Sequence, residues 1–594
     1  MRRLLIAAAL ASVAACGGEN EAAPSIDPSA ELNAIADEYL AAMLDYSPFS
    51  IVFAGLTDAV KEDHAAMEDN SPAGLARLQH TEDKLSARLE RIDAAALGER
   101  ADWVLYETLK EQFGASRQMR VCRLNLWNVN HMSGWQNSFP LVAEMQPVST
   151  PVEQAMALAR WRRLPAYLEQ ERENLDAGLA AGYSAPKRVV ARVIAQLDAV
   201  LDAPPENLPF LSFAKKADGN AEFAAAMKTL EFEEIAPALD EFRNYLRDAY
   251  LPKARDSLSI KSVPNGEQCY EALLRAYHTA EIGGAATFEH GRKAVEANRA
   301  DVVRRGEAMF NETDFAAILQ RTKDDPANRF RSEQELIDFT RALEPVAREK
   351  IAPFFSKLPD QPMIVEPFPD YLKGTGQSSR YEPKPAADGP ATYRIDTDDW
   401  ATQTKGEAEI VLVHEGWPGH HLQIATAYAV EGLHPVTRLF GSTAYIEGWA
   451  RYAEALAEEA GLYQNGYGAI SRRAWPARGM VVDPGIHLYG WTNEQAAAFL
   501  VESGRFDEKT AEAMLDRIAV IPGQLTAYDT GGLEIASLRA EAVQRLGARF
   551  DIQSFHDRVL ENGAVPLAAL REHVEAWIGE EEAKAKAKAK AKAN

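Results

Sequence analysis

Helical periodicity restricts the fold of this chain more strongly than any single motif does. Apolar residues recur every three or four positions over residues 30–46, 74–97 and 536–550, so each stretch has one apolar face when coiled as an α-helix. The 594 residues are 46% hydrophobic, which is ample material for a large core. The sequence therefore predicts a mainly α protein with one large helical domain.

An interruption of the helical pattern divides this predicted domain into two parts. Pro264 and Gly266 interrupt the helical pattern within SIKSVPNGEQCY. We expect an N-terminal helical half over residues 35–260 and a second helical half, with the candidate catalytic residues, over residues 261–579. The Lys-Ala repeat of residues 580–594 is predicted to be a solvated, low-complexity tail.

Two β-prone runs are the main exception to the helical pattern. Residues 362–372 and 390–397 are short, and Pro, Gly and Asp bound them, while residues 373–389 have the composition of a loop. We expect a small sheet next to the helix that follows. Its exposed edge could pair with an extended peptide. The alternative is a hairpin that only covers the helical core.

The N-terminus has the form of an export signal. Arg2 and Arg3 precede a short apolar run, and small residues then lead to Cys16. The segment VAAC resembles the bacterial lipobox, in which cleavage exposes the cysteine for acylation. We therefore predict a signal peptide over residues 1–15 and a lipidated tether over residues 16–34. The alternative is an ordinary cleaved signal with an incidental cysteine.

The residue after the predicted acylated cysteine indicates whether the lipoprotein stays in the inner membrane or moves to the outer membrane. Gly17 stands where an aspartate would retain a lipoprotein in the inner membrane, so resemblance to sorted lipoproteins favours the outer membrane, facing the periplasm. An oxidising compartment permits Cys122 and Cys269 to pair, although two buried free thiols fit the sequence equally well.

The net charge argues against nucleic acid as a partner. The formal charge is −24 at pH 7. Phosphate-binding surfaces need clustered Lys and Arg, so we predict no nucleic-acid partner.

Residues 411–423, VLVHEGWPGHHLQ, come close to the His-Glu-x-x-His pattern of zinc enzymes. That pattern lets two histidines one helical turn apart meet one ion, but Pro418 takes the place of the second histidine. On an unbroken helix, His420 would lie about 240° around the axis from His414, and His421 would lie about 10.5 Å further along. Neither histidine could then share an ion with His414.

A break in this helix would allow His420 or His421 to share an ion with His414. Pro418 lacks an N–H and clashes with the carbonyl four residues earlier, while Gly416 and Gly419 loosen the backbone. If two residues loop out, His420 becomes the second ligand, and if three loop out, His421 does. We favour His420 and keep His421 as its competitor.

The density of histidine favours a divalent ion. Three of the 12 histidines fall within eight residues of one another, beside Glu415 and behind an apolar run. Buried imidazoles and carboxylates need partners, and one cation would satisfy them all. Catalytic zinc keeps three protein ligands, and Glu447, set among apolar residues, is the candidate third ligand. The alternative for Glu447 is an ion pair with Arg451. The remaining acids of that helix are expected on its solvated face: Glu454, Glu458 and Glu459.

These motifs resemble those of the bacterial domain-of-unknown-function eight-eight-five family of lipoproteins, which is distantly related to gluzincin zinc metallopeptidases. The resemblance covers nearly the whole mature chain and is carried by HEGWPGHHLQ, IEGWARYAE, VVDPGIHLYGWTNEQA, IPGQLTAYDTG and RFDIQSFHDRVLENGAVPLAALREHV. It implies a fold like the all-helical zinc carboxypeptidases and oligopeptidases. It also implies that Glu415 is the general base and that Glu447 is a metal ligand.

The expected activity is zinc-dependent hydrolysis of peptides or other amides at the cell envelope. Zinc would be held by His414, His420 and Glu447. The donors to the oxyanion are expected to be His487 and Tyr528, because each follows a predicted Pro-Gly turn. The alternatives for these two are a capping histidine and a core tyrosine.

Two further alternatives stay open. Arg380 and Tyr381 could hold a substrate carboxylate, or they could brace the loop before the second β-prone run. The protein could also be a non-catalytic envelope lipoprotein whose metal site is structural or lost. The intact Glu415 favours the enzyme, because a closed structural site needs no general base.

Overall fold

Helices make up most of the chain, as the periodicity predicts. The computed structural model describes residues 27–593 apart from 57–59, 61–62, 99, 218, 370–372 and 374–377. The predicted signal peptide and Cys16 lie outside the described residues. The helices of the N-terminal part are α1 (Pro28–Tyr46), α2 (Ser50–Phe53), α3 (Pro72–Leu89), α4 (Arg100–Met119), α5 (Trp135–Met145), α6 (Pro151–Trp161), α7 (Leu164–Ala180), α8 (Lys187–Leu201), α9 (Pro209–Ser212), α10 (Ala221–Leu230) and α11 (Ala236–Tyr245).

The remaining helices surround the candidate site or pack behind it. They are α12 (Gly266–His278), α13 (Gly284–Phe310), α14 (Phe315–Asp324), α15 (Glu333–Ile351), α16 (Lys405–Glu415), α17 (His420–Tyr428), α18 (Val436–Leu439), α19 (Thr443–Glu459), α20 (Tyr467–Ala474), α21 (Gly479–His487), α22 (Asn493–Val501), α23 (Glu508–Val520), α24 (Gln524–Leu546), α25 (Ile552–Leu560) and α26 (Leu567–Ala593).

Helix α1 shows how the apolar spacing becomes structure. Its buried residues follow the three-and-four spacing of one helical face: Leu32, Ile35, Ala36, Tyr39 and Leu40. Asp27 caps the helix by accepting a hydrogen bond from the Ser29 N–H at 3.2 Å. The helix therefore starts at Pro28, inside the predicted tether of residues 16–34.

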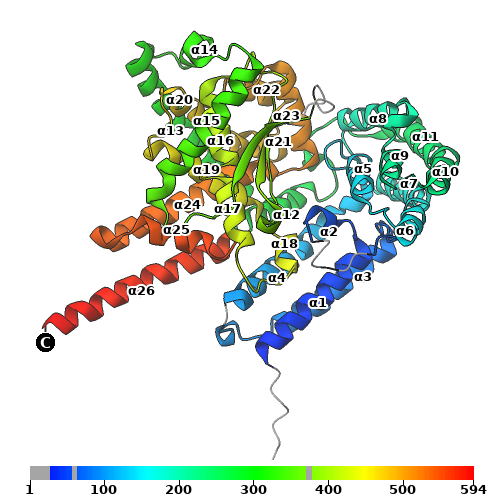
Figure 1. Cartoon of the computed structure of the whole chain (residues 1–594), viewed down its shortest axis with the longest axis horizontal. Helices are drawn as coiled ribbons and strands as arrows, with labels where there is room; N and C mark the ends of the chain where they lie inside the picture. Colours follow the sequence, from blue (N-terminus) through cyan, green and yellow to red (C-terminus); the bar gives the residue numbers. More distant parts are fainter. Residues whose placement is uncertain are drawn as a thin grey trace, which may run out of the picture.

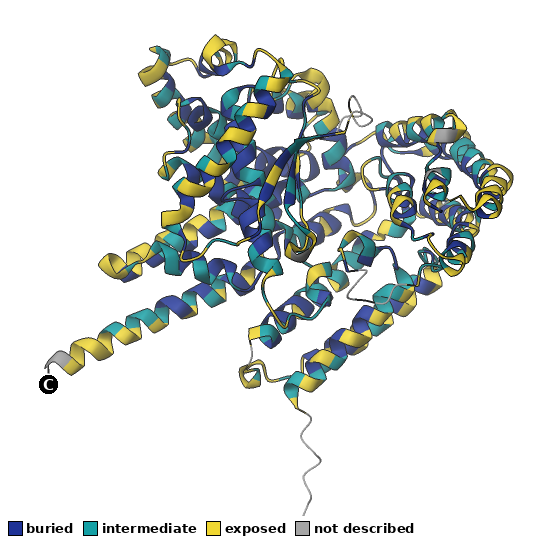
Figure 2. Ribbon diagram, in the orientation of Figure 1, coloured by how far each residue is buried: buried dark blue, intermediate teal, exposed yellow. Residues whose placement is uncertain are grey.

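The two largest clusters of buried hydrophobic residues lie in different bodies of helices. One cluster lies between Phe49 and Ala254, and Figure 1 shows the helices α5–α11 that carry it gathered at one end of the long axis. The largest cluster joins the sheet to several helices, including α15, α16, α19, α24 and α26. The outer end of α26 leaves the body and is exposed (Figure 2), as expected for a Lys-Ala tail.

A three-stranded sheet lies next to α16, where the sequence predicts a small β element. Its strands are β1 (Met363–Pro367), β2 (Arg380–Glu382) and β3 (Ala391–Ile395), in the order β1–β3–β2. Strand β1 is parallel to β3, so the two predicted runs do not form a hairpin with each other. Strand β2 is antiparallel to β3 and lies within the segment predicted to be a loop. Its three residues are too few to give a clear alternating pattern.

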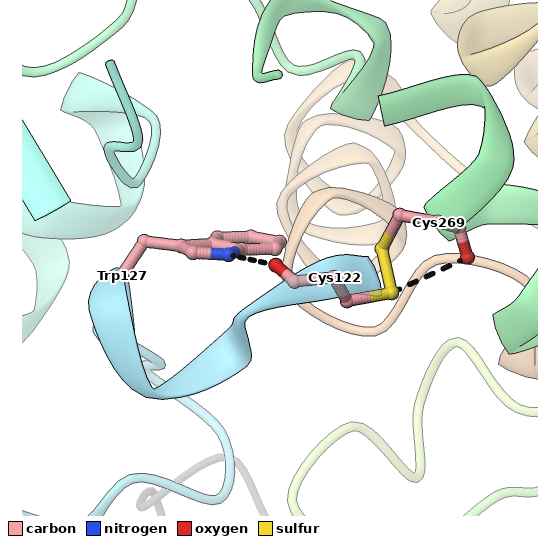
Figure 3. Close-up of a disulfide and its surroundings, with 3 residues drawn as sticks. All are labelled: Cys122, Trp127 and Cys269. Atoms are coloured by element: carbon pink, nitrogen blue, oxygen red, sulfur yellow. Dashed lines mark hydrogen bonds between the residues drawn. A yellow bond between two sulfur atoms is a disulfide. The ribbon is translucent and has the colours of Figure 1, made fainter. Parts of the chain in front are cut away.

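Cys122 and Cys269 form a disulfide 147 residues apart in the sequence (Figure 3). Cys122 follows α4 and Cys269 belongs to α12, so the bond joins the two predicted halves. Both residues are buried, and the indole N–H of Trp127 donates to the Cys122 carbonyl at 3.0 Å. The structure therefore contains the disulfide, and not the two buried free thiols that the sequence also allowed.

Among the described residues, no helix has the length and apolar character needed to span a bilayer.

We expect the double substitution Cys122→Ala and Cys269→Ala to lower the free energy of unfolding by about 2–5 kcal/mol, because the crosslink restricts the unfolded chain. Urea unfolding of protein expressed from residue 27 measures this change. As a control, a reducing agent should destabilise the wild type and leave the double variant unchanged. Equal stability of the two oxidised proteins would contradict the expectation.

Candidate metal centre

The predicted break in the histidine helix is confirmed. Helix α16, which begins with a capping box at Thr404, ends at Glu415, and α17 begins at His420. The link contains the cis Trp417–Pro418 peptide bond. It also needs a glycine, because a Cβ on Gly419 would lie 2.0 Å from the carbonyl oxygen of His414. The chain therefore turns tightly over the end of α16 before helix resumes.

This turn brings His420, and not His421, to His414. The Nε2 atoms of His414 and His420 each lie 3.4 Å from Oε2 of Glu447 on α19. One ligand atom from each of the three residues lies within 4.8 Å of the other two. The three residues favoured as ligands on sequence grounds are thus together.

His421 points away from this cluster into the core. It is fully buried, its Nδ1 is 3.1 Å from the Tyr381 hydroxyl, and its Nε2 is 3.1 Å from the Gln361 carbonyl oxygen. Burial lowers the pKa of His421 to about 4. The ring therefore stays neutral and uses both nitrogens to tie α17 to the sheet region.

Glu454 orients His414 by contacting the ring nitrogen that faces away from Glu447. Its Oε1 lies 2.9 Å from His414 Nδ1, and the Arg451 guanidinium donates to the same oxygen at 2.9 Å. A carboxylate on the far nitrogen of a histidine is the usual second partner of a metal-binding imidazole. The prediction that Glu454 is solvated is wrong, because α19 turns this residue toward α16, where it is 2% exposed. Its neighbour Glu459 is on the open face, as expected, and pairs with Arg539.

Glu447 does not form the ion pair with Arg451 that was its alternative. Arg451 instead contacts Glu454 and also lies 3.5 Å from Asp529 of α24. Glu447 Oε2 is buried and, among the described residues, has no hydrogen-bond partner. His420 Nδ1 is likewise buried and unpartnered in that part of the chain.

The electrostatics of the cluster favour a positive charge at its centre. Burial by itself would lower the pKa of His414, but the carboxylates of Glu447 and Glu454 raise it to about 10. Burial opposes ionisation of Glu447 too, yet His414 and His420 hold its pKa well below the usual value. The cluster therefore attracts a cation, which a metal ion can supply.

Two of the three spacings between ligand atoms match those of a tetrahedral zinc site. With bonds of about 2.0–2.1 Å, two ligands of a tetrahedral zinc ion lie about 3.3–3.4 Å apart. The two histidine-to-glutamate distances are 3.4 Å. An unpartnered carboxylate oxygen and two imidazole nitrogens are also the donor types that zinc prefers.

Glu415 lies beside the cluster and is held by the sheet. Its Oε2 accepts a hydrogen bond from the backbone N–H of Tyr381 at 2.8 Å. Strand β2 thus directs its open edge at Glu415, and Tyr381 braces both Glu415 and His421. Arg380 also lines the pocket, but its guanidinium pairs with Glu382 at 3.0 Å and stacks over Phe368. This pairing agrees with the bracing alternative for Arg380.

The cluster opens into a cavity of about 780 Å³. A volume of this size suits a short peptide or another small ligand. Its walls mix apolar side chains with hydroxyl groups and charges. The lining includes Ser379, Tyr393, Val411, Ile424, Ile446, Trp475, Arg505, Phe506, Met514, Arg517, Leu525 and Tyr528.

Tyr528 belongs to this pocket, where the sequence places an oxyanion donor. Burial and the charge of Glu447 raise the pKa of Tyr528, so its phenol stays protonated near neutral pH. Arg517 donates to the phenol oxygen at 3.2 Å, which leaves the Tyr528 O–H hydrogen for another acceptor.

His487 does not lie in this pocket, so the structure does not support its predicted role. Its Nδ1 accepts from the Ile260 N–H at 3.1 Å, and its Nε2 lies 3.1 Å from the Ile518 carbonyl oxygen. The ring is fully buried, and burial lowers its pKa to about 3. The Pro-Gly pair before His487 does not make a turn, because both residues lie inside α21.

Glu454 was assigned to a solvated face, and Arg505 and Arg517 were not among the residues predicted for the site. Glu454 had one available signal: it follows Glu447 by seven residues, which places both on one helical face. Arg505 and Arg517 come from a loop and a helix well separated from the histidines, and no spacing connects them.

The fold and the cluster define a mainly α protein with a candidate metal centre in an internal pocket. The chain belongs to a bacterial family of proteins of unknown function, DUF885, whose model matches residues 48–574. This confirms the family that the motifs predict. No curated protein matches the sequence.

Two solved structures share the fold. One, titled a "putative lipoprotein" from Colwellia psychrerythraea, has a TM-score of 0.81 and 24% identity, covering 93% of this chain and 99% of that chain. The other, titled a "putative lipoprotein of unknown function" from Shewanella oneidensis, has a TM-score of 0.76 and 19% identity, covering 91% and 99%.

We expect His420→Gln to weaken zinc binding at least about 100-fold, more than the loss of an outer partner costs, because it removes a ligand. His421→Gln should keep stoichiometric zinc and instead lose about 1–3 kcal/mol of stability, because buried partners are left unsatisfied. Elemental analysis and chelator competition measure zinc, and urea unfolding measures stability. The reverse result would make His421 the ligand.

We expect the wild type to lose stability relative to His487→Gln as the pH falls from 7 to 4. The unfolded histidine binds a proton below about pH 6.5, whereas the folded His487, with its pKa near 3, does not. The slope approaches about 1.4 kcal/mol per pH unit. Urea unfolding across this range measures the difference, with substitution of the exposed His290 as the control. Parallel curves for wild type and His487→Gln would contradict a neutral His487.

Proposed function

We propose that this protein is a zinc-dependent hydrolase of peptide or other amide bonds in short substrates. The observation that carries the proposal is the convergence of His414, His420 and Glu447 next to Glu415 in a pocket of limited size. Two imidazoles and one carboxylate are a known ligand set for catalytic zinc, which keeps its fourth position open. The distant relation to gluzincin metallopeptidases that the motifs imply supports the same activity.

A bound zinc ion would polarise the scissile carbonyl and lower the pKa of a water molecule toward about 7. Glu415 would accept the proton of the attacking water and deliver it to the leaving amine. The Tyr381 N–H holds Oε2 of Glu415 at 2.8 Å and so orients the carboxylate toward the ligands. The Tyr528 O–H would donate to the oxygen that gains negative charge.

The rival proposal is a non-catalytic envelope lipoprotein with a structural or lost metal site. The open pocket disfavours a structural site, which is normally closed by a fourth protein ligand. Glu415 accepts only one backbone hydrogen bond that the structure gives among the described residues, at Oε2, and a structural metal site needs no general base beside its ligands. We therefore prefer the hydrolase.

The proposed location is the cell envelope. The lipobox-like segment and the names of the two related structures support a lipid anchor at Cys16. The residue after that cysteine favours the outer membrane, with the enzyme facing the periplasm. The proposed substrates are therefore periplasmic peptides or other amides.

We expect Glu415→Gln to retain stoichiometric zinc and to lower peptide hydrolysis by about 10²–10⁴-fold, the usual contribution of a positioned proton acceptor. A library of fluorogenic short peptides measures the activity, and elemental analysis measures the zinc. Substitution of Glu431 in the exposed loop after α17 by Gln is the control.

Two results would count against the proposal. If the wild-type protein contained no stoichiometric zinc, the proposed zinc-dependent mechanism would be refuted. Equal activity of wild type and Glu415→Gln would remove Glu415 as the base.

A further inference from the structure

Two arginines that line the pocket form no ion pair with the described residues. Within the described part of the chain, the other arginines that line the pocket form ion pairs: Arg380 with Glu382, Arg451 with Glu454, and Arg472 with Glu458. Arg505 and Arg517 line the same pocket, and neither has an ion-pair partner among the described residues. In a protein of net charge −24, two such cations in one cavity are unexpected.

Arg517 is positioned by neutral groups. Its Nη2 donates to the Gln524 side-chain oxygen at 2.7 Å and to the Tyr528 hydroxyl at 3.2 Å. Its Nε is buried and, in the described chain, unpartnered. The guanidinium therefore has spare donor capacity next to a residue of the proposed active site.

Arg505 approaches the same tyrosine from the loop after α22. Burial and the charge of Arg451 lower the pKa of Arg505, and the carboxylates of Glu407 and Glu454 and the phenol of Tyr528 oppose that shift. Those two carboxylates are already engaged, Glu407 in the capping box of α16 and Glu454 with His414. Arg505 as a whole is exposed, and it is one of the residues that line the pocket.

Building on the proposed function, we propose that Arg505 and Arg517 bind the free C-terminal carboxylate of a peptide substrate. Guanidinium groups hold carboxylates through paired, charge-assisted hydrogen bonds, and the pocket provides two of them. Tyr528 connects this anchor to the cluster, because it contacts Arg517 and its pKa responds to Glu447. The enzyme would then remove residues from the C-terminus, with the carboxylate role moved from Arg380 to this pair.

The small cavity agrees with this assignment. About 780 Å³ accommodates a few residues beyond the scissile bond, and a charged anchor in that space selects chain ends over internal segments. The apolar walls around Trp475, Phe506 and Met514 would receive the neighbouring side chains. The side-chain carboxylate of an acidic residue in the substrate could bind the two arginines in the same way. The binding test therefore includes a peptide that carries a glutamate and no free C-terminus.

The test measures binding to zinc-loaded Glu415→Gln protein, so it does not depend on turnover. The probes are an acetylated Leu-Ala-Phe tripeptide with a free carboxylate, the same peptide with a C-terminal amide, and an amidated acetyl-Leu-Glu-Phe. Titration calorimetry gives the three affinities. We expect the amide to bind about tenfold or more weakly than the free acid, and the glutamate peptide not to recover the loss.

Substitutions of the pocket arginines test which of them bind the substrate carboxylate. In the Glu415→Gln background, Arg517→Met and Arg505→Met should each reduce the preference for the free acid severalfold, and together should abolish it. The matched control is Arg380→Met, which removes a paired pocket arginine and should leave the preference unchanged. Zinc content and thermal unfolding verify that each variant is folded, and Arg517→Lys, expected to restore part of the preference, separates loss of charge from loss of structure.

The outcomes separate this inference from the proposed function. Equal binding of acid and amide, binding of neither, recovery by the glutamate peptide, or loss of the preference in Arg380→Met would overturn the assignment of a C-terminal carboxylate to Arg505 and Arg517. Hydrolysis by the wild type could still stand in each case. Conversely, a preference that depends on both arginines in a wild type without hydrolytic activity would support the carboxylate site and refute the hydrolase.

Discussion

Close contact between α19 and α24 is the constraint on which the candidate site depends. A Cβ on Gly448 would lie 2.4 Å from the Cα of Gly531, and a Cβ on Gly531 would lie 1.7 Å from the carbonyl oxygen of Ala444. Glycine at both positions lets the two backbones touch. Because α19 carries Glu447 and α24 carries Tyr528, this contact places a proposed ligand and a proposed oxyanion donor in one pocket.

A buried charge network extends from that contact. His414 is held by Glu454, Glu454 by Arg451, and Arg451 lies near Asp529 on α24. Buried charges are costly unless each has a partner, and here each of these has one. The exception is the centre, where Oε2 of Glu447 faces two imidazoles and has no hydrogen-bond partner among the described residues. Glu447 and Glu454 both belong to α19, so the helix that carries one proposed ligand also orients His414.

Much of the fold could be predicted because it rests on local patterns. The apolar spacing of α1 and α24 survives in the folded protein, and Pro418 with its glycines breaks the helix where the clash with the preceding turn requires. Strand β2 was missed because three residues carry too little pattern. Glu454 was misplaced because an acidic helical face looks the same whether it meets water or a buried histidine.

The errors in the site have a common physical cause. His487 and Tyr528 each follow a Pro-Gly pair, yet the first is locked to two backbone groups and the second faces the pocket. Their roles depend on which helices surround them. Arg505 and Arg517 become conspicuous only when the ion pairs of all their neighbours are known, which is a property of packing and not of composition.

The sequence by itself determined the helical class, the break at Pro418 and the residue types that can hold a metal ion, because backbone sterics and apolar periodicity act over a few residues. Only the tertiary structure decided that His420 and not His421 meets His414, and that Cys122 pairs with Cys269. It also decided which of many charged side chains share one cavity. Those outcomes depend on contacts between segments far apart in the chain, whose geometry arises from the packing of whole helices.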